Sequence, residues 1–363
     1  MRIGFDARMI DHPGIGRYIA SLFPEMVKQA PNDEFTLLGD PEKLFGLEKN
    51  GNITVREWKA PVFSIQEQIS GAFKLRDLDV LHVPNFNIPL MFKGKMVVTV
   101  HDLIYLLFPG SLPSALAGHY ARFMIGSVLR RANSVIAVSA HTAGDLVKNF
   151  GSKYSDKITV ILEATSGEFS HLPGREKIEN VKRRFRLPDK FILYVGSIKP
   201  HKNVATLIKV FERVKARGLS HQLVICGRWD KKEDHLKDSI RDNSIKYIGE
   251  MPTEDLAVLY HMADILVHLS LYEGFGLTVL EAMRCGTPVV ASDTSSLPEV
   301  AGGAAAIVSL DDIRHITDKV YNVLTDESLR LAMIKAGLEH VKRFSWEKAA
   351  RETLEVYRKK VRG

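Results

Sequence analysis

The sequence predicts an α/β protein built from two doubly wound domains, in which helices cover both faces of a parallel sheet. Short β-branched runs alternate with amphipathic helical segments along most of the chain, which is the pattern of parallel α/β units. The 363 residues also exceed what one ordinary hydrophobic core holds. Paired domains of this kind place the carboxyl ends of their strands around a central cleft, where we expect the function to lie.

The first half of the chain opens on a strand, RIGFD, which a loop joins to a helix entered at GIGRY. We place the first domain at residues 1–170, because a polar, glycine-containing passage follows from residue 166 and reads as a hinge. Further strands are predicted at EFTLLG, VLHVP, MVVTVH, SVIAVS and ITVIL.

The second half repeats the pattern, and we place the second domain at residues 171–345. A last helix, at about residues 346–363, carries Trp346, Ala349, Leu354 and Tyr357 at helical spacing and is expected to pack back on the first domain. Strands are predicted at FILYVGS, QLVICG, IKYIGE and ILVHLS, and at the β-branched pair Val289 and Val290.

Composition narrows the class of protein. Hydrophobic residues make up 45% and charged residues 26%, as in ordinary globular proteins, and the two cysteines share no metal-binding spacing. The N-terminus carries charges where a signal peptide is apolar, and the longest apolar stretch is interrupted by His101 and Asp102. The net charge of +7 suits a phosphate-bearing ligand or an anionic lipid surface, and no basic block with aromatics favours nucleic acid.

Two acids stand out in the otherwise apolar or small stretch YEGFGLTVLEAMRCGTPVV. Glu273 precedes the predicted start of a helix, and Glu281 lies within that helix. The amides of Phe275, Gly276 and Leu277 form the helix N-terminus, which favours an anion. Lys202 follows another strand, in GSIKPHKN, so its ammonium is expected near the same edge. The alternative for each is a solvated or helix-capping side chain.

These motifs together resemble family 4 of the retaining glycosyltransferases, which have the GT-B fold of two Rossmann-like domains. The resemblance rests on EGFGLTVLEAM, CGTPVVAS and YVGSIKPHKN, and it continues in GIGRY, VHDL and SDTSSLPEVAGGAA. Because several spaced motifs agree in order, it covers nearly the whole chain.

The resemblance implies a role for each acid. It implies that Glu281 binds the ribose hydroxyls of a nucleotide, that Glu273 orients the donor sugar and that Lys202 neutralises the diphosphate. It also implies that the turn formed by Gly274, Phe275, Gly276 and Leu277 contacts the donor. Carboxylates that accept from hydroxyls and a lysine beside a helix N-terminus agree with these roles.

In the first domain, the resemblance assigns His101 to the cleft, near the acceptor or the donor sugar. Gly14 and Gly16 could let the backbone approach the donor, or they could form only the turn into a helix. Two positions depart from the family pattern, which often has arginine where this chain has Ser197 and His201. We therefore expect Ser197 to border the phosphate site and Lys202 to carry more of the charge.

Other classes of protein compete with this reading. A dinucleotide-dependent dehydrogenase is suggested by GIGRYI, but Ile19 replaces the third glycine of that fingerprint and the preceding loop is long. A non-catalytic nucleotide-sugar-binding subunit would lose acceptor-side groups, whereas His101 and Glu273 are both present. A phosphorylase-type relative would need a lysine that binds pyridoxal phosphate, for which no context is evident.

We therefore expect a hexosyltransferase. Likeness to bacterial polysaccharide mannosyltransferases points to transfer of mannose from GDP-mannose, with retention, to a hydroxyl of a glycan or lipid-linked acceptor. A UDP-sugar donor with glucose or another hexose is the alternative. No nucleic acid partner and no cofactor are expected.

No metal ion is expected, because the acids of DLD, Asp77 and Asp79, precede a strand instead of following one. We expect a cytoplasmic protein. Peripheral contact with an anionic membrane is expected through the basic end of the last helix, with a solvated helix face as the alternative.

Overall fold

A computed structural model describes residues 1–47, 52–109, 115–241 and 243–362. The chain forms two compact units: unit 1 comprises Met1–Ala164 and Phe344–Gly363, and unit 2 comprises Thr165–Arg343. The boundary that we expected at residue 170 falls inside unit 2 in this division. The reason is local packing, because the Phe169 ring lies 5.8 Å from the Tyr260 ring of unit 2.

Unit 1 contains a parallel sheet of seven strands among the described residues. They are β1 (Arg2–Asp6), β2 (Glu34–Gly39), β3 (Ile53–Glu57), β4 (Val80–Val83), β5 (Lys95–Val100), β6 (Ser134–Ala137) and β7 (Ile158–Val160). Their order is β3-β2-β1-β4-β5-β6-β7, so the direction of winding reverses between β1 and β4. In open α/β sheets such a switch point is where ligands bind, at the carboxyl ends of the strands.

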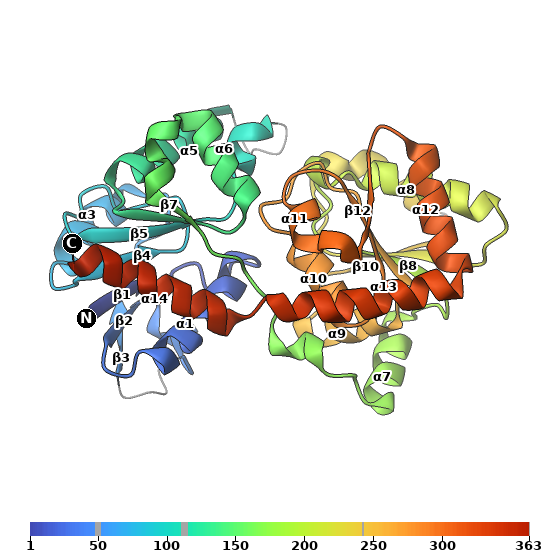
Figure 1. The fold of residues 1–363 in the computed structure, drawn as a ribbon, viewed down its shortest axis with the longest axis horizontal. Helices are drawn as coiled ribbons and strands as arrows, with labels where there is room; N and C mark the ends of the chain where they lie inside the picture. Colours follow the sequence, from blue (N-terminus) through green and yellow to red (C-terminus); the bar gives the residue numbers. More distant parts are fainter. Residues whose placement is uncertain (48–51, 110–114, 242, 363) are drawn as a thin grey trace. The chain divides into compact units, whose positions relative to one another are not determined.

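Helices cover both faces of this sheet. They are α1 (Ile15–Gln29), α2 (Pro41–Leu44), α3 (Ile65–Lys74), α4 (Ile104–Leu107), α5 (Ala115–Arg131), α6 (Ala140–Phe150) and α14 (Trp346–Arg362). Successive strand residues point to opposite faces, so Val97 joins the core under α1 and α14 while Val98 joins the core under α5. Helix α14, red in Figure 1, lies against α1 and buries Leu354 and Tyr357.

Unit 2 contains a second parallel sheet, with six strands among the described residues. They are β8 (Phe191–Val195), β9 (Gln222–Cys226), β10 (Ile245–Gly249), β11 (Ile265–His268), β12 (Val289–Ser292) and β13 (Ala306–Val308). The order β10-β9-β8-β11-β12-β13 again reverses once, between β8 and β11. Unit 2 therefore has its own switch point.

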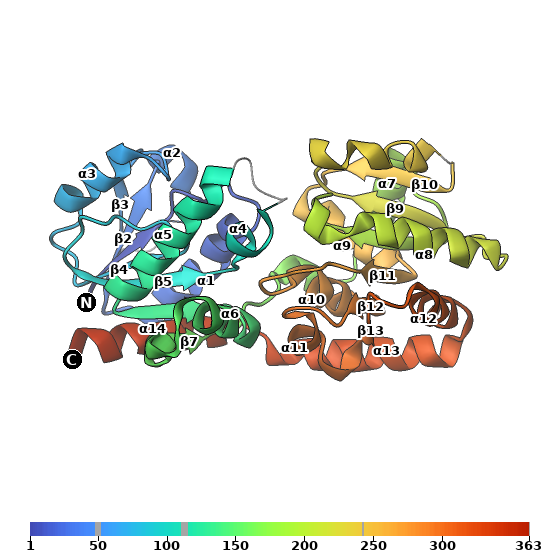
Figure 2. The same ribbon diagram turned by 90° about the horizontal axis from the view of Figure 1, so that it is seen from above.

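The helices of unit 2 follow the same plan. They are α7 (Arg175–Phe185), α8 (Val204–Ala216), α9 (Thr253–Met262), α10 (Leu277–Arg284), α11 (Leu297–Ala301), α12 (Ile313–Thr325) and α13 (Glu327–His340). One core packs Phe211 of α8 and Val320 of α12 against Ile192 and Tyr194 of β8. Helix α13 runs beside α10 and α12, as both views show (Figures 1 and 2).

These parallel sheets confirm the predicted α/β class with two Rossmann-like domains. Two strands escaped the sequence analysis, and both lie at sheet edges. β3 carries Arg56 and Glu57 and is only partly buried, so its apolar alternation is weak. β13 has only three residues and follows the small-residue run GGAA.

Candidate functional site

The switch point of unit 2 brings two loops together. The loop after β8 carries Ser197 and Lys202, and the loop after β11 carries Glu273. Because β8 and β11 are parallel neighbours, both loops leave the same edge of the sheet. Residues that are 71 positions apart in sequence therefore meet at this edge.

Lys202 and Glu273 form a direct ion pair. The Lys202 Nζ atom lies 2.6 Å from Glu273 Oε1 and 2.7 Å from Oε2. Both side chains are mostly buried, with exposed fractions of 16% and 11%. From the sequence we expected them to bind different parts of one ligand, and the structure brings them into contact. A lysine ammonium has three N–H donors, so the pair offers a cation and a carboxylate side by side.

Donors from the end of β11 and from the loop after it hold the Glu273 carboxylate. Its Oε1 atom accepts from His268 Nε2 at 2.7 Å and from Ser270 Oγ at 2.7 Å, besides Lys202. Burial alone would raise the pKa of Glu273, but the Lys202 charge and the His268 hydrogen bond hold that pKa well below its ordinary value. The acid is therefore ionised at neutral pH. Its Oε2 atom has fewer of these donors and is the better placed to accept from a hydroxyl.

His268 is a site residue that the sequence analysis missed. It ends β11, is 1% exposed, and stacks on the Tyr194 ring of β8 with a centroid distance of 6.1 Å and an interplanar angle of 12°. Among the described residues its Nδ1 atom is buried without a hydrogen-bond partner, so the Nε2 proton is the one that serves Glu273. Its place at a strand end, in ILVHLS, was the available signal, and the same signal singled out His101.

Close packing and hydrogen bonds hold the turn after Glu273. Gly276 precedes α10 with a φ of 103°, and a Cβ atom there would lie 2.9 Å from a Leu297 methyl carbon, so glycine is required. Ser296 Oγ bonds to the carbonyls of Glu273 and Phe275, at 3.0 and 2.8 Å. Leu277 is the first residue of α10, and Gly274 is buried with its neighbours in the turn. The predicted donor turn is therefore a rigid element at the N-terminus of a helix.

Glu281 lies inside α10 and is 2% exposed. Its Oε2 atom accepts from the Tyr260 hydroxyl of α9 at 2.9 Å. Tyr260 was not singled out from the sequence, because nothing in TEDLAVLYHMA distinguishes it from a core residue. The pair shows that Glu281 is held as a buried acceptor and is not a solvated surface glutamate.

The loop after β8 supplies fewer cations than its sequence contains. His201 is 3% exposed, and burial together with the Lys202 charge lowers the pKa of His201 to about 4. It is therefore neutral near pH 7 and adds no positive charge. The Ser197 carbonyl accepts from the Tyr194 hydroxyl at 3.1 Å, which fixes the start of the loop. His201 therefore does not replace the positive charge of the arginine that the family pattern often has at its position.

In unit 1, His101 follows β5 at the carboxyl edge of the sheet. Its Nδ1 atom lies 2.9 Å from Glu163 Oε1, and its Nε2 atom lies 3.0 Å from the Pro84 carbonyl oxygen. Both neighbours offer acceptor oxygens, and both ring nitrogens donate when the ring is protonated. Burial alone would lower the pKa of His101, but the hydrogen bond and charge of Glu163, with the charge of Asp102, raise it. The surroundings of His101 therefore favour the protonated ring, which donates from both nitrogens.

Polar and aromatic contacts within unit 1 surround His101. The Tyr18 ring of α1 meets the His101 ring edge-on at 4.9 Å, and the Tyr18 hydroxyl lies 3.0 Å from Thr99 Oγ1. Thr99 in turn lies 2.8 Å from His82 Nε2, and His82 Nδ1 is bonded to the Tyr357 hydroxyl of α14. Burial lowers the pKa of His82 to about 3, so this ring is neutral. Glu163 and Tyr18 were not predicted, because their partners are distant in sequence.

The glycines of the GIGRY loop have different surroundings. A Cβ atom on Gly16 would lie 1.9 Å from the Ile10 carbonyl oxygen, so the close approach of two backbone segments accounts for this glycine. Gly14 precedes α1 and has no atom within 4 Å of a built Cβ. The entry turn into α1 therefore explains Gly16 on packing grounds alone.

The acids of DLD lie at the amino end of β4, away from the carboxyl edge. Arg56 donates to both oxygens of Asp77 at 2.7 Å, and Arg2 lies 3.0 Å from Asp79. The hydrogen bond from Arg56 lowers the pKa of Asp77 to about 2. Within the part of the chain that the structure describes, no three His, Cys, Asp or Glu residues are grouped as metal ligands would be.

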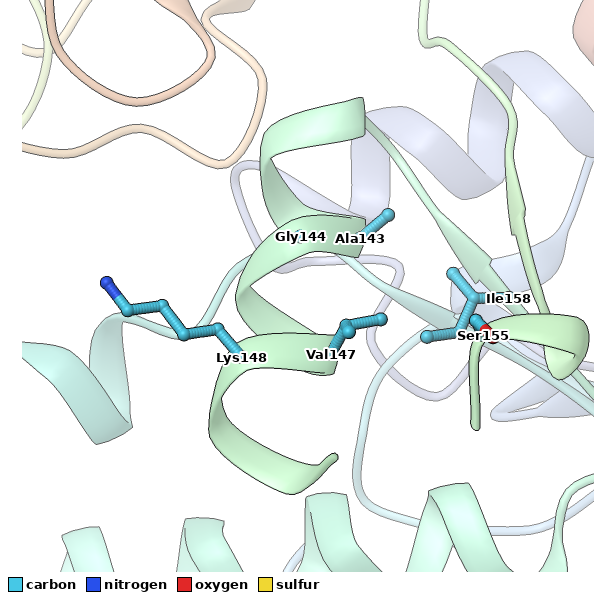
Figure 3. A pocket seen from close by; sticks show the side chains of 6 residues that line it. All are labelled: Ala143, Gly144, Val147, Lys148, Ser155 and Ile158. Carbon is cyan, nitrogen blue, oxygen red and sulfur yellow. The ribbon is translucent and has the colours of Figure 1, made fainter. Parts of the chain in front are cut away.

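A hollow on unit 1 lies away from these residues. It borders α6 and the start of β7, and Figure 3 shows Lys148 extending away from Val147 and Ile158. Few polar groups line this hollow, so we assign it no function. Within the described ranges, no helix combines the length and apolarity that crossing a membrane requires.

Comparisons with known proteins bear on this arrangement. Residues 176–340 match the family described as "Glycosyl transferases group 1", and residues 14–163 match the family described as "Glycosyltransferase Family 4". O-antigen chain mannosyltransferase B of Escherichia coli is 30% identical over 295 residues, which cover 79% of this chain and 76% of that protein.

The chain belongs to the glycosyltransferases. The glycosyltransferase is also 29% identical over 290 residues to the serotype-specific mannosyltransferase WbdA of Escherichia coli; the match covers 77% of this chain but only 35% of WbdA. Among solved structures, Anabaena HepE in complex with UDP and glucose superposes with a TM-score of 0.75 at 18% identity, covering 98% of each chain. This likeness confirms the GT-B fold of the glycosyltransferase.

Proposed function

We propose that the glycosyltransferase moves mannose from GDP-mannose to a hydroxyl of a glycan or lipid-linked acceptor, with retention of anomeric configuration. The observation that carries the proposal is the Lys202–Glu273 pair at the switch point of unit 2. A nucleoside diphosphate sugar has a phosphate next to a ring of hydroxyls, and a cation next to an ionised carboxylate complements that sequence of groups. The mannosyltransferase names of the relatives support mannose.

Each residue has a role in this proposal. Lys202 stabilises the leaving diphosphate, Glu273 Oε2 accepts from a sugar hydroxyl, and Glu281 accepts from the ribose hydroxyls. The His101 imidazolium of unit 1 donates to an oxygen of the sugar or of the acceptor by releasing the Pro84 carbonyl. Catalysis then consists mainly of electrostatic stabilisation of the leaving group by fixed charges, without a cofactor or a metal ion.

A UDP-sugar donor is the second candidate, because the HepE structure that shares this fold holds UDP and glucose. The two donors differ in base and in sugar. Both have a diphosphate and a sugar hydroxyl, so the proposed roles of Lys202 and Glu273 are the same for either donor. A non-catalytic nucleotide-sugar-binding subunit would bind donor without turning it over.

A donor panel tests the proposal. Purified protein is incubated with GDP-mannose, UDP-glucose and UDP-galactose, and both the rise in melting temperature and the rate of donor hydrolysis are measured. We expect GDP-mannose to protect most and to be hydrolysed. If only a UDP-sugar raises the melting temperature and is hydrolysed, the second candidate is selected. If a donor raises the melting temperature but is not turned over with any acceptor, the non-catalytic subunit is favoured.

Contact with an anionic membrane is a further proposal for α14. Lys348, Arg351, Arg358 and Lys359 are exposed on this helix, while its apolar side packs on α1. A basic surface of this kind gains about 1 kcal/mol per charge near anionic lipid. Sedimentation with anionic vesicles should fall as salt rises, and sedimentation that ignores salt would contradict the proposal.

A further inference from the structure

Four aromatic side chains gather at the carboxyl edge of the unit 1 sheet. Phe63 lies 6.1 Å from Phe86 and 5.9 Å from Tyr120, and Phe86 lies 5.8 Å from Tyr105, as ring-centroid distances. Phe63, Phe86 and Tyr105 belong to segments that follow β3, β4 and β5, whereas Tyr120 comes from α5. Phe63 is 50% exposed, Tyr105 41% and Tyr120 37%. We call these four residues the aromatic platform.

The backbone is strained in order to present Phe63. Its φ is 70°, a region that residues other than glycine rarely adopt. The strain is compensated by a hydrogen bond from the Phe63 amide to Glu67 Oε2 at 3.1 Å and by Ser64, which caps α3. Strained positions are kept where the surrounding structure imposes them, and they gather at functional sites. Here the residue in the rare conformation carries a large apolar ring that is half exposed to solvent and packs on Phe86 and Tyr120.

A buried polar network fixes the platform from below. Glu67 is fully buried and lies 2.5 Å from the Arg8 guanidinium, and its other oxygen accepts from the Asn87 amide. The Asn87 side-chain oxygen accepts from the Tyr120 hydroxyl. One carboxylate therefore holds both the Phe63 backbone and, through Asn87, the Tyr120 ring. The rings are pre-organised, which lowers the entropy cost of binding a ligand on them.

Two members of the platform lie close to the His101 site along the chain. Pro84, whose carbonyl accepts from His101 Nε2, is two residues before Phe86, and Tyr105 is four residues after His101. Asp6 and Arg8, at the end of β1, and Asn87, beyond the end of β4, mark the switch point of this sheet. The platform therefore occupies the edge at which open α/β sheets bind ligands.

We propose that the aromatic platform binds the pyranose rings of the acceptor glycan, by stacking the C–H faces of the sugars on Phe63 and Tyr105. This inference rests on the proposed function and names the acceptor class for unit 1. A flat aromatic ring suits a sugar, which is apolar on its faces and polar at its rim, and the Tyr105 hydroxyl adds a polar group at the edge of one ring. The charges beneath the platform, Arg8 with Asp6 and Glu67, are paired with one another, so a neutral ligand fits better than an anionic one.

Leucine substitutions separate a glycan from a lipid surface, because leucine keeps the apolar character and removes the flat ring. Phe63→Leu and Tyr105→Leu are compared with Phe45→Leu, which alters an aromatic residue of unit 1 that is 83% exposed and lies outside the platform. The acceptors are butyl and octyl glycosides with one to four mannose or glucose units. Acceptor KM, kcat and the rate of donor hydrolysis without acceptor are measured for each variant.

We expect the two platform variants to raise the KM for the longer glycosides about 10-fold, with less than a twofold change for the monosaccharide glycoside. The rate of donor hydrolysis in both platform variants should equal that of the unaltered protein. The Phe45→Leu variant should equal the unaltered protein in acceptor KM, in kcat and in the rate of donor hydrolysis. Three results would overturn the inference. The KM values could be unchanged in the platform variants, or the KM could follow the alkyl length instead of the number of sugars. The unaltered protein could also hydrolyse the donor and accept none of the glycosides. Absence of donor hydrolysis in the unaltered protein would instead contradict the proposed function.

Discussion

Both units place an ion pair at the switch point of a parallel sheet, but the two pairs differ in accessibility. In unit 1, Arg8 meets Asp6 at 2.6 Å and Glu67 at 2.5 Å, and these side chains are 4%, 2% and 0% exposed. In unit 2, Lys202 and Glu273 are 16% and 11% exposed. The same position in the fold thus holds a closed cluster in one unit and a reachable pair in the other.

The chemistry of the two cations fits this difference. The Arg8 guanidinium reaches two carboxylates and the Ala60 carbonyl at once, and it lies 3.5 Å from the Trp58 ring centre, so its donors serve the protein. The Lys202 ammonium is a compact point charge against one carboxylate. We therefore propose that the unit 1 cluster is a scaffold and that the unit 2 pair is a ligand site. Substitutions should therefore affect stability in the first and activity in the second.

The largest expected effect is on the stability of unit 1. Arg8→Met leaves two buried carboxylates without their cation, which costs about 3–5 kcal/mol of unfolding free energy. Urea denaturation monitored by circular dichroism measures it, with Arg122→Met, at an exposed position of α5, as the control. A loss below about 1 kcal/mol would show that the cluster is not a scaffold.

In unit 2 the expected effects are on ligand affinity. Glu281→Ala should weaken nucleoside diphosphate binding by about 1.5–3 kcal/mol, since a charged acceptor for the ribose hydroxyls is lost. Glu273→Gln should reduce turnover of the sugar donor and leave nucleoside diphosphate binding nearly intact. Calorimetric titration with GDP and with GDP-mannose separates the two roles. Equal losses for both ligands in Glu273→Gln would show that it does not contact the sugar.

The smallest effect concerns the protonation of His101. Glu163→Gln removes the carboxylate charge while the ring stays buried, so the pKa of His101 should fall from its raised value. Because the pKa of His101 is raised in the folded state, its protonation stabilises the fold at pH values below the ordinary pKa of 6.5. This stabilisation is lost as the pH rises through the folded-state pKa. The stability difference between the two proteins should therefore shrink with rising pH. An unshifted His101 titration by NMR would contradict the pairing.

Much of this arrangement could be predicted from sequence, because strand ends are local signals. His101, Ser197 and Lys202 were expected at the carboxyl ends of predicted strands, and Glu273 was expected just before a helix; the structure places them there. The ion pair between Lys202 and Glu273 was not foreseen, since it depends on β8 and β11 being neighbours.

What the sequence analysis missed consists of long-range partners. Glu163 contacts a residue 62 positions away, and Tyr260 contacts one 21 positions away, so no local pattern marks them. The aromatic platform was missed for the same reason, because Phe63 and Tyr120 come from separate segments that only the fold unites.

The rate of hexosyl transfer in excess chelator, compared between the unaltered protein and Lys202→Met, tests the central claim most directly. We expect transfer by the unaltered protein to persist, because Lys202 and the N-terminus of α10 are proposed to stabilise the leaving diphosphate without an ion. Lys202→Met should lower kcat/KM by about 10² or more, whereas Lys199→Met, in the same loop, should have little effect. Transfer that chelator abolishes and magnesium or manganese restores, with Lys202→Met nearly as active as the unaltered protein, would contradict this claim and return attention to Asp77 and Asp79.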